Sequence, residues 1–404
     1  MDVKKLRSDF PILQKEINGK KIVYLDSACM SLRPKQVIDK INEYYNEYPG
    51  CAGRSVHKIA TKVTMAMDEA RIKVQNLIHA KEKDEIIFNR NTTEGLNMVA
   101  HGLPWKKGDR ILITDHEHNS NLIPWLVLQE KKGIKLDVVP SNPDNTFNIN
   151  TFENLLNSDV KLVSMAHTTN LDGHTIPAYE IIKLVHDHDA LVMLDGAQSA
   201  PHMPIDVQKL DVDYFTFSAH KMCGPAGIGV LYGKYSLLED LPPLIAGGST
   251  VKNATYTTAE FLPPPDKFEG GLLDYAGIMG MGAAVDYLQN IGLNEIEQHN
   301  IKLNQIMTNA LSNYEEITIL GPQDPKQRGC TFSFNIKNVD CHDVALILDE
   351  VGNIMIRSGM HCVHAWFNHH KINGSARAAI YLYNTEGEVK FFCEKVEEII
   401  ENFK

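Results

Sequence analysis

The sequence lacks the features of membrane, nucleic-acid-binding and disulfide-rich proteins. No apolar stretch approaches the roughly 20 residues that a membrane-spanning helix needs, and the charged opening MDVKKLRSDF contains no apolar signal-peptide region. There is no basic tract, and the net charge of −11 would repel the phosphates of a nucleic acid. The 7 cysteines show no C-x-x-C spacing, hence neither a disulfide framework nor a zinc pattern. We therefore expect a cytoplasmic protein that binds neither membranes nor nucleic acid.

What is present is the composition of a large folded protein. The chain has 404 residues, of which 43% are hydrophobic and 23% charged, ordinary values for globular proteins. Short apolar runs alternate with amphipathic stretches such as 64–77 and 181–188, which predicts an α/β fold with a mostly parallel sheet covered by helices. The expected strands are 86–88, 111–113, 136–139, 162–165, 191–194 and 214–217.

The pattern of predicted helices and strands changes after about residue 265. The proline-rich turn 262–265 precedes long helical patterns and a strand pair near residues 331–336. We expect a large α/β domain over residues 18–264 and a smaller C-terminal α+β domain over residues 265–404, joined by the N-terminal segment 1–17.

A lysine and an aspartate follow two of the apolar runs. The run 191–194 ends in Asp195, and the run 214–217 leads through Ser218 and His220 to Lys221. In open parallel sheets, ligands bind beyond the carboxyl ends of strands. Pyridoxal 5'-phosphate (PLP) requires an amine for its Schiff base and an anion that keeps its pyridine nitrogen protonated. We predict that Lys221 and Asp195 hold PLP, the alternative being an ordinary surface lysine.

Hydroxyl groups at the start of a predicted helix offer a place for the cofactor phosphate. Asn91 and Glu94 resemble a capping box, and Thr92 and Thr93 stand beside the free backbone N–H groups of the first turn. An anion there gains from hydrogen bonds and from the helix dipole. A plain helix cap is the alternative interpretation.

Two further polar residues come after predicted strands. His118 follows the strand 111–114, where an imidazole can stack on the cofactor ring, and Asn170 follows the strand 162–165, where it can donate to the ring oxygen. Reading His116 and His118 as metal ligands is the alternative, but the spacing places no third ligand. We predict no metal site.

Cys362 stands in an unusually polar run, from Arg357 to His364. Cationic neighbours favour the thiolate, which is the nucleophilic form of cysteine, so we predict a catalytic thiol rather than a buried core cysteine. With His369 and His370 the run could also be a zinc cluster, although its spacing matches no structural zinc pattern.

Arg377 lies among alanines and Ile380, which indicates a buried setting where an arginine needs an anion. A purely structural arginine is the alternative interpretation. We predict that Arg377 binds the substrate.

These motifs resemble those of class V (fold type I) PLP enzymes, most closely the group II, SufS-like cysteine desulfurases and selenocysteine lyases. The resemblance covers nearly the whole chain. Its motifs are 26–28, 32–34, 118–125, 195–198, 218–221, 357–362, and Arg377 with 383–385.

The resemblance implies a seven-stranded-type, mostly parallel sheet, a homodimer, and a role for each matching residue. The catalytic residues would be Lys221 as the Schiff-base lysine, Cys362 as the persulfide-forming cysteine and His118 over the ring. The other cofactor contacts would be Asp195 on the pyridine nitrogen, Gln198 and Asn170 near the ring oxygen, and Thr92, Thr93, Ser218 and His220 at the phosphate. Substrate would meet Arg377, Arg357, Asn170 and His57.

The activity implied is conversion of L-cysteine to L-alanine. The sulfur would remain as a persulfide on Cys362 and pass to an acceptor protein for iron-sulfur cluster assembly. The alternatives are a selenocysteine lyase acting on L-selenocysteine, another class V lyase or transaminase, and a non-enzymatic scaffold subunit of a sulfur-transfer complex.

The chain departs from the family pattern in two loops. Leu272 stands where the family has a threonine that reaches the phosphate of the partner subunit's cofactor, and leucine cannot make that hydrogen bond. Around Cys362, Met360 replaces one histidine of a common pair, and the residues 363–366 replace the usual continuation. We expect these changes to bear on cofactor affinity, substrate choice and the sulfur acceptor.

Overall fold

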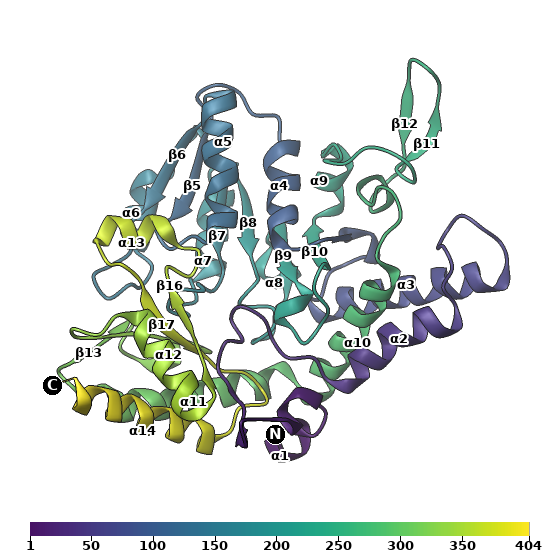
Figure 1. Ribbon diagram of the computed structural model, residues 1–404. Coiled ribbons are helices and arrows are strands. Elements are labelled where there is room, and N and C mark those ends of the chain that lie inside the picture. The colour runs from purple at the N-terminus through teal and green to yellow at the C-terminus, as the bar shows by residue number, and fades with distance from the viewer. Residues whose placement is uncertain (404) are drawn as a thin grey trace.

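The computed structural model describes residues 1–403 and is built around a seven-stranded mixed sheet (Figure 1). Six strands run in one direction, and β10 alone is antiparallel to both of its neighbours. The glycine-flanked β10 was not among the strands expected by residue number, whereas the other six lie where the apolar runs placed them. In order across the sheet, the strands are β4 (Ile86–Asn89), β10 (Gly229–Gly233), β9 (Tyr214–Ser218), β8 (Leu191–Asp195), β7 (Val160–Ala166), β5 (Arg110–Thr114) and β6 (Lys135–Val139).

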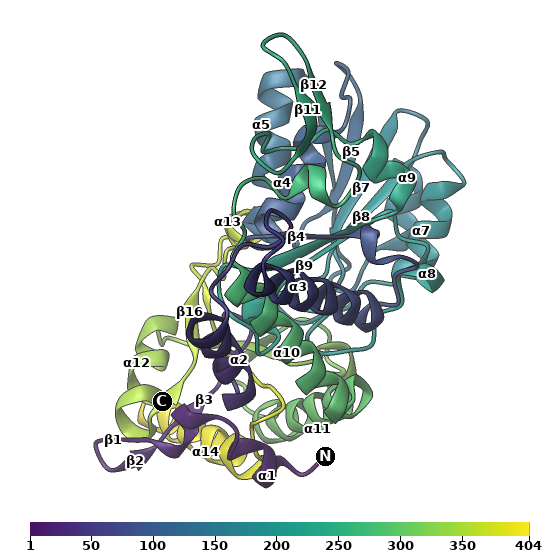
Figure 2. The same ribbon diagram turned by 90° about the vertical axis from the view of Figure 1, so that its right-hand side faces the viewer.

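Both faces of this sheet are buried, because side chains alternate across each strand. In β5, Ile111 and Ile113 join one apolar cluster with α4 (Thr92–Gly102) and α5 (Ile123–Lys132). Leu112 joins the cluster on the opposite face, with α3 (Lys58–Leu77), α7 (Ala178–His186) and α10 (Tyr275–Ile291). Figure 2 shows the sheet between α4 and α5 on one side and α7 on the other.

The C-terminal part forms a second sheet with its own apolar cluster, at the lower left of Figure 1. Its strand order is β13-β14-β17-β16, and all its pairs are antiparallel. The strands are β13 (Ile317–Leu320), β14 (Thr331–Ile336), β17 (Ser375–Ala379) and β16 (Arg357–Gly359), with the helices α11 (Leu293–Leu311), α12 (Cys341–Gly352) and α14 (Glu386–Asn402). The predicted α/β fold with a smaller α+β region is confirmed.

The chain passes between the two parts more than once. Helix α10, beyond the Pro263–Pro265 turn, packs against α2 (Lys35–Glu47) and α3 of the large part. Strand β3 (Val23–Tyr24), near the N-terminus, pairs in parallel with β15 (Ile354–Met355) of the small part. The domain limits 18–264 and 265–404 stay a prediction.

The remaining elements are short or peripheral. None of the helices in residues 1–403 combines the length and hydropathy that a membrane span requires. The hairpin β11 (Val251–Ala254) and β12 (Ala259–Phe261) projects from the molecule (Figure 1). The others are α1 (Val3–Arg7), β1 (Glu16–Ile17), β2 (Lys20–Lys21), α6 (Ile149–Leu155), α8 (Val207–Leu210), α9 (Tyr235–Asp240) and α13 (His364–His370).

Candidate active site

A cavity of about 230 Å³ lies where strands of the large sheet end and the small sheet approaches. Asp195 and Ser218 reach it from the ends of β8 and β9, and Arg357 and Arg377 reach it from β16 and β17. The structure thus gathers most of the predicted residues around one space. The predicted residues that line it are Thr92, Thr93, His118, Asn170, Asp195, Gln198, Ser218, His220, Lys221, Arg357 and Arg377.

Lys221 and Asp195 both line this cavity and interact electrostatically. Lys221 ends the short turn after β9, and burial lowers the pKa of its amine, while Asp195 opposes the shift. Asp195 is 6% exposed and accepts a hydrogen bond from the Ala197 N–H at 2.9 Å. Burial raises the pKa of this carboxyl against the influence of Lys221 and that N–H. A lowered lysine pKa favours the neutral, nucleophilic amine, and the buried carboxyl is suited to a further cationic partner.

Hydroxyl groups converge at the N-terminus of α4. The Thr92 backbone N–H donates to Ser218 Oγ at 2.8 Å, and the two hydroxyls lie 2.7 Å apart. Thr93 Oγ1 lies 2.7 Å from Ser120 Oγ. Asn91 caps the helix by accepting from the Glu94 N–H at 3.1 Å, so the expected cap is present together with the hydroxyl cluster. Such donors at a helix N-terminus suit a phosphate.

His118 is held as a neutral ring with a defined tautomer. Its Nδ1 accepts from the Ser120 N–H at 3.0 Å, which leaves the proton on Nε2. Burial, together with the charges of Lys221 and Arg357, lowers the pKa of His118 to about 3. The imidazole therefore presents an N–H group.

Two amide side chains line the middle of the cavity. Gln198 Nε2 donates to the Ala28 carbonyl at 2.7 Å, and its buried Oε1 has no hydrogen-bond partner among the described residues. Asn170 Nδ2 donates to the His361 carbonyl at 2.7 Å. In this arrangement Asn170 holds the loop before Cys362, and its contact with cofactor or substrate stays a prediction.

Two arginines face each other across the small sheet. Arg357 of β16 stands directly opposite Arg377 of β17. Arg377 is fully buried; its Nη1 donates to the Asn170 carbonyl at 2.8 Å and its Nη2 lies 3.6 Å from Asp26 Oδ1. Its Nε has no hydrogen-bond partner among the described residues, and burial lowers its pKa. A carboxylate is the ligand that such a pair of guanidinium groups suits.

Cys362 lies beside the cavity, in contact with Arg357, which lines it. Arg357 Nη2 contacts Cys362 Sγ at 3.5 Å. The two histidines expected to support the thiolate point elsewhere: His361 Nε2 contacts Ser375 Oγ at 2.9 Å, and His364 Nδ1 lies 3.0 Å from Asn119 Nδ2. Burial lowers the pKa of His361 to about 2, so it carries no charge near neutral pH. Of the cationic neighbours proposed from the sequence, only Arg357 contacts the sulfur.

His57 lies outside this cavity. It is exposed and caps α3, its Nδ1 accepting from the Ala60 N–H at 3.2 Å. Its role in binding substrate stays a prediction.

Three lining residues that carry a hydroxyl or thiol were not singled out from the sequence: Cys29, Ser120 and Thr168. Ser120 and Cys29 lay within or directly after the motifs 118–125 and 26–28, so their position in those motifs was a usable signal. Thr168 follows β7 within two residues, and no motif marked it.

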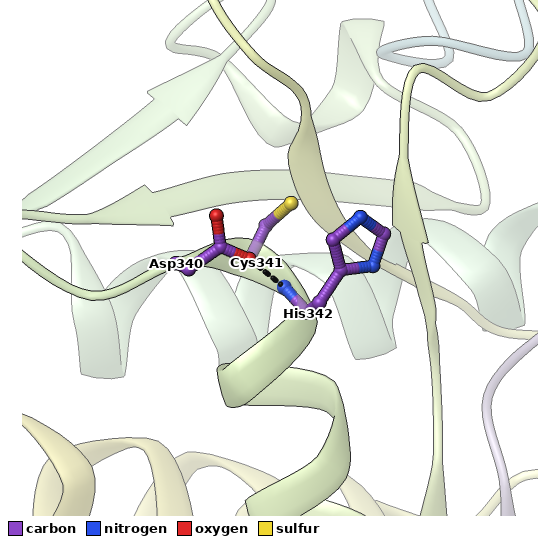
Figure 3. Close-up of side chains that lie close together, drawn as sticks. All are labelled: Asp340, Cys341 and His342. Carbon is purple, nitrogen blue, oxygen red and sulfur yellow. Dashed lines mark hydrogen bonds between the residues drawn. The ribbon is translucent and has the colours of Figure 1, made fainter.

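A separate cluster of ligand-type side chains stands at the start of α12 (Figure 3). Asp340, Cys341 and His342 have ligand atoms within 4.8 Å of one another. Asp340 Oδ1 accepts from the His342 N–H at 2.8 Å as the helix cap, and His342 Nδ1 lies 2.8 Å from Ser358 Oγ. Capping and this hydrogen bond account for the arrangement.

The residues of the cavity fit PLP. The hydroxyl cluster at α4 suits its phosphate, the buried Asp195 suits its pyridine nitrogen, and Lys221 suits its aldehyde. Gln198 also lines the cavity, and its Oε1 has no hydrogen-bond partner among the described residues. Four further cavities lack this combination of a lysine after a strand end and a buried carboxylate at the neighbouring strand end.

Known proteins resemble the chain over its whole length. The profile of the family Aminotransferase class-V matches residues 23–392. A protein of Halalkalibacterium halodurans named "Probable cysteine desulfurase" is 41% identical over 406 aligned residues, covering 100% of this chain and 99% of that protein. The cysteine desulfurase of Escherichia coli O8 is 37% identical, with 96% and 95% covered. The apo structure of cysteine desulfurase from Thermococcus onnurineus NA1 is 34% identical and superposes with a TM-score of 0.94, covering 99% of this chain and 98% of that one.

Proposed function

Because the chain belongs to the aminotransferase class-V family, we propose that it is a PLP-dependent cysteine desulfurase. It converts L-cysteine to L-alanine and retains the sulfur as a persulfide on Cys362. The observation that carries this proposal is the cavity in which Lys221 and Asp195 face two arginines, with the Cys362 thiol in contact with one of them.

The arginines orient the substrate. The carboxylate of cysteine pairs with Arg377 and Arg357, which places a negative charge beside two like charges directly opposite each other on neighbouring strands. The substrate amine then points toward Lys221 and the thiol toward Cys362. Bound PLP supplies an electron sink that acidifies the α-proton of the substrate.

Lys221 and His118 handle protons. The lowered pKa of Lys221 favours the neutral amine, whose Nζ can accept the α-proton and return it. His118, protonated at Nε2 and neutral, offers a hydrogen-bond donor and adds no charge beside Lys221.

Cys362 takes the sulfur. Arg357 at 3.5 Å stabilises the thiolate, which attacks the substrate sulfur. The carbon–sulfur bond of the substrate breaks, a sulfur–sulfur bond forms, and the substrate carbon takes a proton to give alanine. Cysteine and one enzyme thiol thus yield alanine and one persulfide, with no external oxidant or reductant.

The persulfide then passes to an acceptor protein, which we place in iron-sulfur cluster assembly. Cys362 is half-buried on a loop beside the cavity, a position that a partner's thiol can approach. We also propose a homodimer in the cytoplasm; the free state of the cysteines in residues 1–403 supports a reducing compartment.

The test is an absorption spectrum of the purified holoenzyme before and after L-cysteine, with alanine assayed in the same samples. We expect a visible band from lysine-bound PLP, a change of that band on adding cysteine, and alanine. Selenocysteine and cysteine sulfinate in parallel separate a desulfurase from a selenocysteine lyase. A protein that binds PLP but forms no alanine from cysteine would contradict the proposal.

A further inference from the structure

A second cysteine lies on the wall of the active-site cavity. Cys29 is half-buried in the turn after β3, where its backbone N–H donates to the Asp26 carbonyl at 3.1 Å. It lines the same space as Lys221, Arg357 and Arg377. Neither the sequence analysis nor the proposed reaction gives this thiol a role.

Cys29 and Cys362 share one guanidinium group. Arg357 lines the cavity with Cys29 and contacts Cys362 Sγ at 3.5 Å. Although burial alone would lower the pKa of Arg357, the nearby sulfurs of Cys29 and Cys362, together with Asp26, raise it overall. The same cavity is also lined by the fully buried Arg377, whose Nε has no hydrogen-bond partner among the described residues.

We propose that Cys29 is a second sulfur-carrying thiol, which takes the outer sulfur from the persulfide on Cys362. This inference rests on the proposed function, because Cys362 must first be loaded by turnover. The Cys29 thiolate attacks the outer sulfur, a new sulfur–sulfur bond forms on Cys29, and the old one breaks. Cys362 leaves as a thiolate, while the proton lost by the Cys29 thiol ends on the Cys362 thiol or the new persulfide. The sum is one persulfide and one thiol before and after.

Two features of the site favour this transfer. A persulfide extends the Cys362 side chain by one sulfur–sulfur bond, about 2 Å, and Cys362 already contacts Arg357, which lines the same cavity as Cys29. Arg357 already contacts the sulfur that must leave as a thiolate, and a stabilised leaving thiolate speeds exchange. After transfer, Cys362 is free for another turnover while the first sulfur stays on the inner thiol.

The experiment loads the holoenzyme with L-cysteine without a reductant or an acceptor, blocks all thiols and persulfides by alkylation, and maps the peptides by mass spectrometry. We expect persulfide on both Cys29 and Cys362 in the unaltered protein. Cys29→Ser should carry it on Cys362 alone and hold about half as much sulfane sulfur per chain. Cys393→Ala, which removes a thiol buried in the small-part core, should keep both sites loaded.

The variant Cys362→Ser separates the relay from direct loading. We expect no persulfide on Cys29 in that variant, since Cys29 receives sulfur only through Cys362. Persulfide on Cys29 of Cys362→Ser would overturn the relay, as would its absence from Cys29 in a protein that forms alanine. A Cys29→Ser protein with a normal PLP band and an unloaded Cys362 would also overturn it. If the unaltered protein forms no alanine, the proposed function itself fails.

Discussion

The two ends of the active-site cavity are built differently. At the cofactor end, Asp195 and Ser218 terminate neighbouring parallel strands, and Thr92 is fixed to Ser218 by two hydrogen bonds. At the sulfur end, Cys362 stands on a loop where His361 and Cys362 adopt left-handed backbone angles, φ 47° and 62°. The cofactor end is therefore a product of the sheet, and the sulfur end depends on a short segment with an unusual backbone.

The large part of the molecule holds that loop in place. The Asn119 N–H donates to the Cys362 carbonyl at 2.7 Å, and Asn170 donates to the His361 carbonyl at 2.7 Å. Both donors follow strands of the large sheet. The sheet therefore positions the cofactor directly and the nucleophile through two carbonyl groups, so the two ends should respond separately to substitution.

The largest effect is expected at the cofactor end. Lys221→Ala removes both the covalent attachment of PLP and the group that moves the α-proton, so alanine formation should fall on the order of 10⁴-fold or more. The visible band of the lysine-bound cofactor should disappear. A retained band would show that another amine holds PLP, and Lys209→Ala, at an exposed lysine, is the matched control.

Next in size is the change at the sulfur end. Cys362→Ser should keep the visible band and the spectral response to cysteine, because the hydroxyl leaves the cofactor end intact. Alanine formation should fall roughly 10³-fold, since a serine hydroxyl is a far weaker nucleophile for sulfur. Peptide mapping should find no persulfide at position 362. Loss of PLP from this variant would show that the cofactor end depends on the sulfur end.

Acid should destabilise the sulfur end through His361, which is 2% exposed. Burial, with Arg377 and Arg357, lowers its pKa from 6.5 to about 2, so below pH 6.5 the unfolded chain takes up a proton that the folded one refuses. Stability present above pH 6.5 is therefore lost as the pH falls. Urea titrations measure the free energy of unfolding at each pH. Below pH 6.5, we expect it to fall less steeply for His361→Gln than for the unaltered protein, by about 1.4 kcal/mol per pH unit. Equal pH slopes would contradict this assignment.

Substrate binding joins the two ends through Arg377. Arg377→Lys keeps the charge but loses the planar pair of donors, a loss of about 1.5–3 kcal/mol for a charged hydrogen bond. We expect KM for cysteine to rise roughly 10- to 100-fold with an unchanged PLP spectrum. Arg90→Lys, at an exposed arginine paired with Glu94, is the control. An unaltered KM would leave Arg377 with a structural role only.

The sequence predicted the cofactor end better than the sulfur end for a physical reason. Apolar runs mark strands, and a polar residue at the end of such a run must lie at the sheet edge, as Asp195 and Ser218 do. Side-chain direction in an irregular loop leaves no such periodic signal, so the sequence could not show that His361 turns to Ser375 and away from Cys362. Strand β10 was missed because its flanking glycines indicate a turn, while its pairing with β4 and β9 is a tertiary effect.

The smallest effect should come from Leu272, which is 67% exposed and replaces the family's threonine. Leu272→Thr should tighten PLP binding about 2- to 10-fold, corresponding to one neutral hydrogen bond of about 0.5–1.5 kcal/mol, provided that a partner subunit brings its cofactor phosphate to this loop. Leu272→Val has nearly the shape of threonine without its hydroxyl and should bind PLP as the unaltered protein does. Fluorescence titration of the apoenzyme with PLP, alongside sedimentation to establish the dimer, measures both variants. Equal PLP affinities of Leu272→Thr and Leu272→Val would show that the cofactor end is complete within one chain. The two ends of the cavity would then differ still more clearly.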